Sequence, residues 1–599
     1  MGKRAKVDSG NFIMQAGILA AAGIIVRIIG LLYRAPLTAV IGDEGNGYYS
    51  FAYNIYANIL LISSYSIPSA ISKIMSQKIA LKEYKNAQRI FKCAFVYVAI
   101  VGGAAAGFAF FAAGLLVVDN AIPVLRIFAP TILLSGFLGV FRGYFQAHRS
   151  MVPTSISQII EQIANALISI GAAMLFINQA GADADDTVRA VRGASGSALG
   201  TGIGVLTALL FVGGIYLYNR QRIIARVDSD KSKELESYGS IAKDILLLVT
   251  PFILSTFIYN CSTAINQTIF AKVMLGKHNV AQSVVSTYYG IYSGKAVVLR
   301  NVPVALASAM SAAIIPTVAT AWVLKEKKDA RYKVRRAVKV TMIIAVPCVG
   351  MFLFLARPIV HFLFPQKSSL DLASRLLMCL AVTVVFYCLS TITNGVLQSI
   401  GLISRPVTHA AIALGIQSVL LWLLLSYTQI GIYAIVIADI VFSVIVCILN
   451  SASLYKHMKY HQEWFTTFVL PAICSLIMGL IAKLIFNLIY HFSNSDRISL
   501  IVAGIIGALI YLFTIIQSGA ISGGELEVYP GGPRLVLFLK KYRLISDKPR
   551  YRIRRERLQR RRRSHSAGSS GHYKADREEF DDIDDLIDDL ENDTDKPSF

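Results

Sequence analysis

Two arginines lie within one apolar stretch near the start of the chain, in the run Ile-Ile-Val-Arg27-Ile-Ile-Gly-Leu-Leu-Tyr-Arg34. Arg27 lies too far inside the stretch to reach the interface by snorkelling. Arg34 follows two helical turns later, so both side chains should lie on nearly the same face. The forked donors of guanidinium groups match phosphate oxygens, so this pair suits a phosphate or pyrophosphate ligand. The alternative is that Arg27 pairs with an acid such as Asp439 or Glu161, while Arg34 only marks the membrane interface.

A second pair of basic residues, Lys295 and Arg300, lies in the apolar stretch 284–313. They are five residues apart, so they should lie on different faces of a helix. Both precede Pro303, which frees a backbone carbonyl and permits a kink. At least one of them is a candidate ligand contact, and pairing with an acid or snorkelling is the alternative for each.

Other polar residues could line a cavity or control access to it. Asp43 and Glu44 lie in the glycine-rich run Ile-Gly-Asp-Glu-Gly-Asn-Gly, where they could gate an outer mouth by bridging a cation across two halves of the protein. A plain solvated turn is the alternative. Glu161, Asn260 and Gln267 are candidates for lining the cavity, although hydrogen bonding between helices is the commoner use of such groups.

Motifs for catalysis or metal binding are missing from the sequence. There is no GxxxxGK[ST], GxSxG or HExxH, and the seven cysteines form neither CxxC nor a Cys/His cluster. We therefore predict a protein that is not an enzyme and has no cofactor or metal site. Without a nucleotide-binding motif, any transport by this chain should be driven by a coupling cation (Na⁺ or H⁺), by membrane potential or by substrate supply.

The candidate residues must be positioned by membrane helices. The 599-residue chain is 55% hydrophobic and only 16% charged, and between residues 11 and 519 it contains about fourteen apolar stretches, most of them 18 to 25 residues long. Such a stretch matches the roughly 30 Å hydrocarbon core of a bilayer. We expect an all-α polytopic membrane protein with about fourteen transmembrane helices. A net charge of +23 could suggest nucleic-acid binding, but the basic residues lie in interhelical loops and one tail.

The loop charges predict the orientation of the chain. Connections on one side of the predicted membrane hold 28 Lys and Arg, against nine on the other. Because basic loops stay in the cytoplasm, we expect a multi-pass protein of the bacterial cytoplasmic membrane with both termini in the cytoplasm.

An internal repeat divides the membrane region. The run Ile67-Pro-Ser-Ala-Ile recurs as Val302-Pro-Val-Ala-Leu, and Gly143-Tyr-Phe-Gln recurs as Gly395-Val-Leu-Gln. Both offsets correspond to six helices, so two six-helix lobes should share one orientation and be related by a pseudo-twofold axis along the membrane normal. Secondary transporters use this layout with the substrate between the lobes. Chance similarity of helix ends that contain Pro or Gly is the alternative.

These boundaries give six segments: a cytoplasmic N-terminus 1–11, an N-lobe 12–217, a cytoplasmic linker 218–240, a C-lobe 241–453, two further helices 454–519, and a cytoplasmic tail 520–599. The tail holds 13 Lys and Arg in 540–563, which suits anionic lipid headgroups, and 12 Asp and Glu in 576–595. Two interpretations of the acidic end fit the sequence. It could be disordered, or it could form a short helix that binds a partner or the arginine run.

The motifs resemble a known family. The run from Arg27 through Arg34-Ala-Pro-Leu, the run Ile41-Gly-Asp-Glu-Gly-Asn-Gly-Tyr-Tyr, and the later runs Phe141-Arg-Gly-Tyr-Phe-Gln-Ala-His and Pro153-Thr-Ser-Ile-Ser-Gln-Ile-Ile-Glu-Gln resemble the stage V sporulation protein B family. That family is similar to the MurJ lipid II flippases and falls in the multidrug/oligosaccharidyl-lipid/polysaccharide (MOP) exporter superfamily. The resemblance spans roughly residues 10–520 and leaves out the tail.

The resemblance implies a V-shaped pair of lobes, alternating access and a groove for an isoprenoid on the last two helices. It also implies that Arg27 and Arg34, with Lys295 or Arg300 from the eighth helix, hold a pyrophosphate. The predicted function is therefore transfer of a lipid-linked cell-wall precursor, such as lipid II, across the membrane for vegetative wall or spore cortex synthesis. There are three alternatives. The protein could export another lipid-linked polysaccharide, or it could be an ion-coupled drug antiporter. It could also be a non-transporting scaffold that recruits wall-synthesis proteins through the acidic tail.

Overall fold

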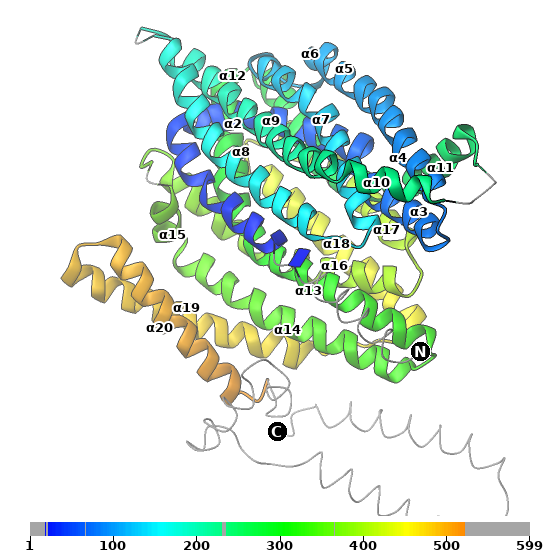
Figure 1. Ribbon diagram of the computed structural model, residues 1–599. Helices are drawn as coiled ribbons and strands as arrows, with labels where there is room; N and C mark the ends of the chain where they lie inside the picture. Colours follow the sequence, from blue (N-terminus) through cyan, green and yellow to red (C-terminus); the bar gives the residue numbers. More distant parts are fainter. Residues whose placement is uncertain are drawn as a thin grey trace, which may run out of the picture. The chain divides into compact units, whose positions relative to one another are not determined.

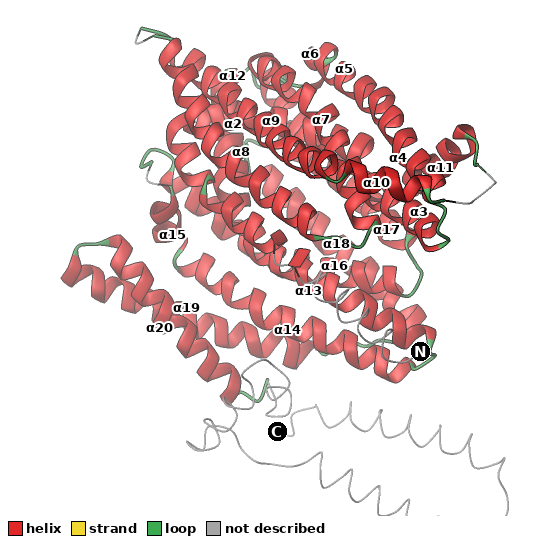
Figure 2. Ribbon diagram, viewed as in Figure 1, coloured by secondary structure: helices red, strands yellow, loops and turns green. Residues whose placement is uncertain are grey.

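The computed structural model (Figure 1) describes residues 18–19, 22–65, 67–181, 183–230, 235–364 and 366–520, without the side chains of residues 65 and 247–259. The predicted N-terminal segment 1–11 and the tail beyond residue 520 lie outside this part, so the predictions for them stay predictions. The described residues belong to one compact unit, Met1–Ala520. This part is almost entirely helical and contains no strand (Figure 2).

The N-lobe contains the helices of the first half of the chain. They are Ala22–Leu32, α2 (Arg34–Leu60), α3 (Ile67–Ala80), α4 (Tyr84–Tyr97), α5 (Gly103–Phe111), α6 (Ala113–Leu116), α7 (Ile122–Ala147), α8 (Val152–Gln179) and α9 (Asp186–Tyr218). Helices α7, α8 and α9 pack closely together, and α2 packs on α9. Helix α2 also packs on the helix Gln282–Ile291 of the second half of the chain, so it lies beside the C-lobe.

The C-lobe contains the helices that follow the linker. They are α11 (Tyr238–Gly276), α12 (Gln282–Ile291), α13 (Val297–Val323), α14 (Lys327–Phe354), α15 (Ala356–Leu363), α16 (Leu370–Ser399), α17 (Ser404–Tyr427) and α18 (Tyr433–Met458). Helix α16 packs against α13, α14 and α18, so it lies at the centre of this lobe. A π-helical turn, Tyr292–Ala296, joins α12 to α13.

Two further helices, α19 (Leu470–Ser493) and α20 (Asp496–Gln517), pack on each other and on α14. In Figure 1 they run beside α14 at the edge of the bundle. Both expose large apolar side chains, among them Leu480, Leu484, Ile501 and Ile505. An apolar surface of this kind faces lipid in a membrane protein.

Twelve helices of the described part are long and apolar enough to cross a membrane. The predicted number of about fourteen is consistent with these twelve taken together with the short apolar helix Ala22–Leu32 and the 39-residue α11. The chain is thus an all-α polytopic membrane protein, as the composition predicts.

The glycine-rich run around Asp43 forms a sharp bend inside α2. Gly42 has φ 72° and ψ 177°, a conformation that interrupts the helix and that a residue with a side chain rarely adopts. Arg34 therefore lies on the segment that continues the first apolar helix, and Asp43 begins the next helix. The bend lies between the first two membrane helices.

The linker is attached to the N-lobe before α11 begins. It contains a short helix, α10 (Arg220–Asp228), and its last residues lie on α4. The Lys85 amide donates to Asp230 Oδ2 at 2.7 Å, and Arg89 donates to the Glu236 carbonyl at 2.7 Å. Helix α11 also contacts α17 of the C-lobe. It therefore joins the two lobes.

Candidate functional site: a polar cavity between the lobes

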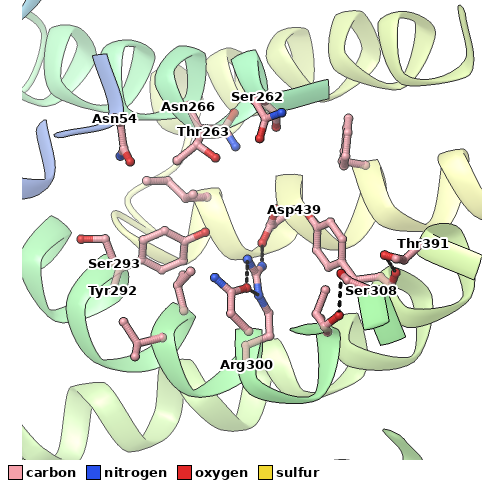
Figure 3. Close-up of a pocket in the computed structure, with 18 of the residues that line it drawn as sticks. Asn54, Ser262, Thr263, Asn266, Tyr292, Ser293, Arg300, Ser308, Thr391 and Asp439 are labelled. Atoms are coloured by element: carbon pink, nitrogen blue, oxygen red, sulfur yellow. Dashed lines mark hydrogen bonds and ion pairs between the residues drawn. The ribbon is translucent and has the colours of Figure 1, made fainter. Parts of the chain in front are cut away.

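A cavity of about 550 Å³ lies where α2 faces the helices of the C-lobe. Its lining is unusually polar for the interior of a membrane bundle, and most of it comes from the C-lobe. The lining includes Arg34, Tyr53 and Asn54 of α2, Asn260, Ser262 and Asn266 of α11, Tyr292, Ser293, Arg300 and Asn301 around the start of α13, Tyr387 and Asn394 of α16, and Asp439 of α18. Figure 3 shows Arg300 and Asp439 pointing toward each other, with Asn266 across the cavity.

Arg34 brings a positive charge to the N-lobe wall of this cavity. Its guanidinium lies 5.6 Å from the centre of the Tyr49 ring, a cation–π contact. Among the residues that the structure describes, no carboxylate forms an ion pair with it. A cation within a membrane usually faces a partner or a substrate pathway. Arg34 is therefore available to an anionic ligand.

Arg300 brings a second positive charge, but Asp439 neutralises it. The two side chains form a short ion pair through Arg300 Nη1 and Asp439 Oδ2. Tyr387 donates its hydroxyl to Asp439 Oδ1 at 2.6 Å, and its ring lies 4.7 Å from the Arg300 guanidinium. The cavity thus holds one cation with an internal counter-ion and one without.

The predicted amides occupy different positions. Asn260 lines the cavity, and its side chain or backbone interacts with another residue. Gln267 is not part of the lining and instead connects the lobes: it donates to the Phe51 carbonyl at 3.0 Å and accepts from Asn54 at 2.8 Å. Gln267 therefore serves the helix–helix hydrogen bonding that was the alternative to lining the cavity.

Arg27 lies outside the cavity lining. Its Nη1 donates to the Ala305 carbonyl of α13 at 2.7 Å, and its side chain is exposed. Neither carboxylate considered as its partner pairs with it, because Asp439 pairs with Arg300 and Glu161 with Arg142. In this conformation Arg27 contacts the C-lobe and remains accessible.

Glu161 is held within the N-lobe. Its carboxylate lies 2.7 Å from Arg142 Nη2, and Arg142 Nε also donates to Ser157 at 3.0 Å. The pair joins α7 to α8 and is only partly buried. This geometry assigns Glu161 to packing within the lobe, away from the cavity.

This placement predicts that Glu161→Gln lowers stability without changing ligand affinity. Loss of a partly exposed ion pair costs about 1 kcal/mol. Thermal unfolding in detergent should show a small decrease in Tm, and an Arg142→Gln/Glu161→Gln double variant should lose little more than either single change. A clear loss of anion binding in folded Glu161→Gln would contradict this assignment.

The lobes are in tight contact at the Asp43 end of the cavity. Lys295, 1% exposed, lies 2.6 Å from Asp43 Oδ1 and donates to Ser369 Oγ at 2.6 Å. The structure thus places Lys295 in a buried ion pair outside the cavity lining, and it places Asp43 on the boundary between the lobes. Glu44 accepts a hydrogen bond from Tyr48 at 2.9 Å and stays within the N-lobe.

Polar and backbone contacts extend this closure. Asn46 donates to the Gly290 carbonyl at 3.0 Å, and Ser293 donates to Ser50 at 2.9 Å. A Cβ on Gly290 would lie 2.0 Å from the Asp43 carbonyl oxygen, and one on Gly47 would lie 2.0 Å from the Ser286 carbonyl oxygen. Helices α2 and α12 can approach this closely only because both positions are glycine. We call this set of contacts the closed end.

Two features of the site have no counterpart among the residues predicted to bind a ligand. Asp439 is the acid that neutralises Arg300, and Tyr387 holds it in place. The signal for Asp439 was present in the sequence, since an acid in the apolar run Ile-Val-Ile-Ala-Asp-Ile-Val marks a functional position in a membrane helix. Its pairing with a residue 139 positions away was not readable from local pattern.

Comparison with known proteins decides the family. A family model described as "Polysaccharide biosynthesis protein" matches residues 13–322. The chain belongs to this family. A second family model, described as "MatE", matches residues 296–423 of the same protein.

Curated relatives of this polysaccharide biosynthesis family member come from Bacillus subtilis (strain 168). The chain is 22% identical over 534 residues to "Lipid II flippase MurJ", covering 85% of this chain and 94% of the relative. It is also 22% identical over 538 residues to "Stage V sporulation protein B", covering 88% of this chain and 99% of the relative. These relatives place the protein among the bacterial multi-pass membrane flippases and transporters of the MOP superfamily, which are not enzymes.

Solved structures have the same fold. "Lipid II flippase MurJ, inward closed conformation" gives a TM-score of 0.59 at 17% identity, covering 83% of this chain and 97% of that chain. A multidrug resistance MATE family transporter in an inward-facing conformation gives 0.57 at 16% identity, covering 74% and 99%. The all-helical membrane fold similar to MurJ and MATE proteins that the resemblance predicts is thereby confirmed.

Proposed function

We propose that this transporter moves a lipid-linked cell-wall precursor, a polyprenyl diphosphate glycan such as lipid II, across the cytoplasmic membrane. The observation that carries the proposal is Arg34, a guanidinium with no described carboxylate partner in a polar cavity between the lobes. A diphosphate is the anion that this forked donor suits best. The relative named as a lipid II flippase supports the same substrate class.

The cavity can hold the headgroup while the lipid tail stays in the bilayer. Amide and hydroxyl groups of Asn54, Asn266 and Ser293 line it and can bind sugar hydroxyls or peptide groups. Exposed apolar residues of α19 and α20, such as Leu484 and Ile505, offer a surface along which a polyprenyl chain could lie. The polar part of the substrate is thereby separated from hydrocarbon during transfer.

The closed end supports alternating access. With both termini in the cytoplasm, as the loop charges predict, the Asp43 end faces the outside. The cavity would then load from the cytoplasmic leaflet, and release would require the Asp43–Lys295 pair and the Gly47–Gly290 contact to separate. Transfer could be driven by a gradient of Na⁺ or H⁺, by membrane potential or by substrate supply.

Reconstitution tests the proposal directly. Liposomes that contain the purified protein and fluorescent lipid II should show transfer of label between leaflets, measured by access of a membrane-impermeant quencher, at a rate well above that of empty liposomes. Unlabelled lipid II should compete better than other polyprenyl diphosphate glycans. Absence of transfer and of binding, with the protein folded, would refute the substrate assignment.

The competing functions give different results in the same assay. An exporter of another lipid-linked polysaccharide would prefer a different glycan among the competitors, and a drug antiporter would bind cations in place of diphosphates. A scaffold that recruits wall-synthesis proteins through the tail would lose its cellular role when residues 520–599 are deleted, whereas a flippase should keep transfer activity in liposomes.

A further inference from the structure

The two guanidinium groups of the cavity are in different states. Arg34 contacts tyrosines and has no carboxylate partner among the described residues, whereas Arg300 is neutralised by a carboxylate within the same cavity. Both Arg300 and Asp439 line the cavity, so an incoming anion can reach the pair without unfolding a helix. Asp439 therefore occupies the position on Arg300 that a diphosphate oxygen would take.

We propose that Asp439 is a built-in counter-anion that the substrate's diphosphate displaces from Arg300, and that the displaced carboxylate then takes up one proton. The inference rests on the proposed function, because it requires an anionic headgroup in the cavity. No covalent bond forms or breaks. The diphosphate exchanges for the carboxylate on the Arg300 guanidinium, and a proton from water binds an Asp439 oxygen.

The reason for proton uptake is electrostatic. When another anion takes the Arg300 guanidinium, the Asp439 carboxylate loses the positive partner that it has in the ion pair. The displaced carboxylate would also stand next to a diphosphate, and like charges close together disfavour ionisation. Both changes favour the protonated acid, so loading an anionic substrate would also load a proton.

The surroundings of Asp439 fit such an exchange. Its other ionisable neighbours in the described part are hydroxyl groups: Tyr387 from α16 donates to it at 2.6 Å, and Tyr289 and Tyr292, from α12 and the turn after it, interact with it electrostatically. These hydroxyls can stay close whether the acid is charged or neutral. On α17, His409 faces Asn450, about three helical turns along α18, and does not meet Asp439.

The experiment measures lipid II affinity and proton uptake in purified full-length protein. Asp439→Asn keeps the shape of the side chain and removes the competing charge. Its affinity for lipid II should rise about tenfold, the usual scale of one charge-assisted hydrogen bond. Adding Arg300→Gln to Asp439→Asn should remove that gain, because the exposed guanidinium is then missing.

Proton uptake is read from a pH indicator in weakly buffered solution when lipid II is added. Wild type should take up about one proton per lipid II bound, by linkage between binding and protonation, and Asp439→Asn should take up none. The diphosphate of lipid II is a diester without a titrating proton near neutral pH, so it does not contribute. The wild-type measurement decides the question even where a variant fails to fold.

The outcomes separate this inference from the proposed function. Unchanged or weaker lipid II binding by folded Asp439→Asn, or wild-type binding without proton uptake, would overturn the exchange while leaving lipid II as the substrate. Failure of wild type to bind lipid II at all would overturn the proposed function and the exchange together.

Discussion

Replacement of Arg34 by alanine should reduce lipid II binding and transfer by about 10- to 150-fold. Arg34 is the cavity cation without a described carboxylate partner, and charge-assisted hydrogen bonds to it are worth about 1.5–3 kcal/mol. Arg34→Lys should recover only part of the loss, because an ammonium group cannot form the forked contact.

The measurement is a lipid II titration together with the liposome transfer assay. Arg189→Ala is the matched control: Arg189 is exposed near the start of α9, and its loss should leave both readouts unchanged. Arg27→Ala can be compared with Arg34→Ala in both assays, because Arg27 contacts the Ala305 carbonyl and does not line the cavity. Wild-type affinity in folded Arg34→Ala would remove the main support for the proposed function.

The fold was predictable because its signals are local. Apolar stretches of membrane length predict an all-α polytopic membrane protein, and the structure has that architecture. The bend at Gly42 follows from the glycine-rich run around Asp43. Such features depend on a few neighbouring residues, so one sequence is enough to read them.

The site was only partly predictable because ion pairs depend on distant contacts. Arg27 and Arg34 share a face, but seven residues separate them by about 10 Å along the helix axis. Arg27 therefore meets the Ala305 carbonyl, whereas Arg34 meets the cavity. In the same way, the sequence shows that Lys295 and Arg300 are charged residues inside an apolar stretch. Their partners Asp43 and Asp439 depend on how α2 and α18 pack against the start of α13 and the turn before it.

These distant contacts also explain how the lobes can move. Local sequence fixes the helices inside each lobe, whereas the closed end consists of a few contacts between α2 and α12 and the turn that follows it. The contacts named above are polar or depend on a glycine, and Phe51 of α2 also stacks on Tyr289 of α12 with ring centroids 4.6 Å apart. A single bulky atom at this boundary should therefore change the balance between conformations without disturbing either lobe.

Gly290→Ala should prevent the closed end from forming. The new Cβ would lie 2.0 Å from the Asp43 carbonyl oxygen and 2.7 Å from the Gly47 amide nitrogen, so backbone and not a flexible side chain blocks it. Overpacking costs about 1–3 kcal/mol even where neighbours can relax, and 1.4 kcal/mol is about tenfold in a population. We expect the closed conformation to lose at least about tenfold in population, and transfer of lipid II to fall to a similar extent.

Cross-linking between the lobes measures this population. The hydroxyls of Ser50 and Ser293 are 2.9 Å apart, so Ser50→Cys with Ser293→Cys should form a disulfide across the closed end under mild oxidation. Gly290→Ala in that background should slow the cross-link strongly. Gly171→Ala, where a Cβ meets nothing within 4 Å, should leave it unchanged. An equal cross-linking rate in folded Gly290→Ala would mean that the close approach of α2 and α12 does not control opening, because the closed end would then form despite the added Cβ.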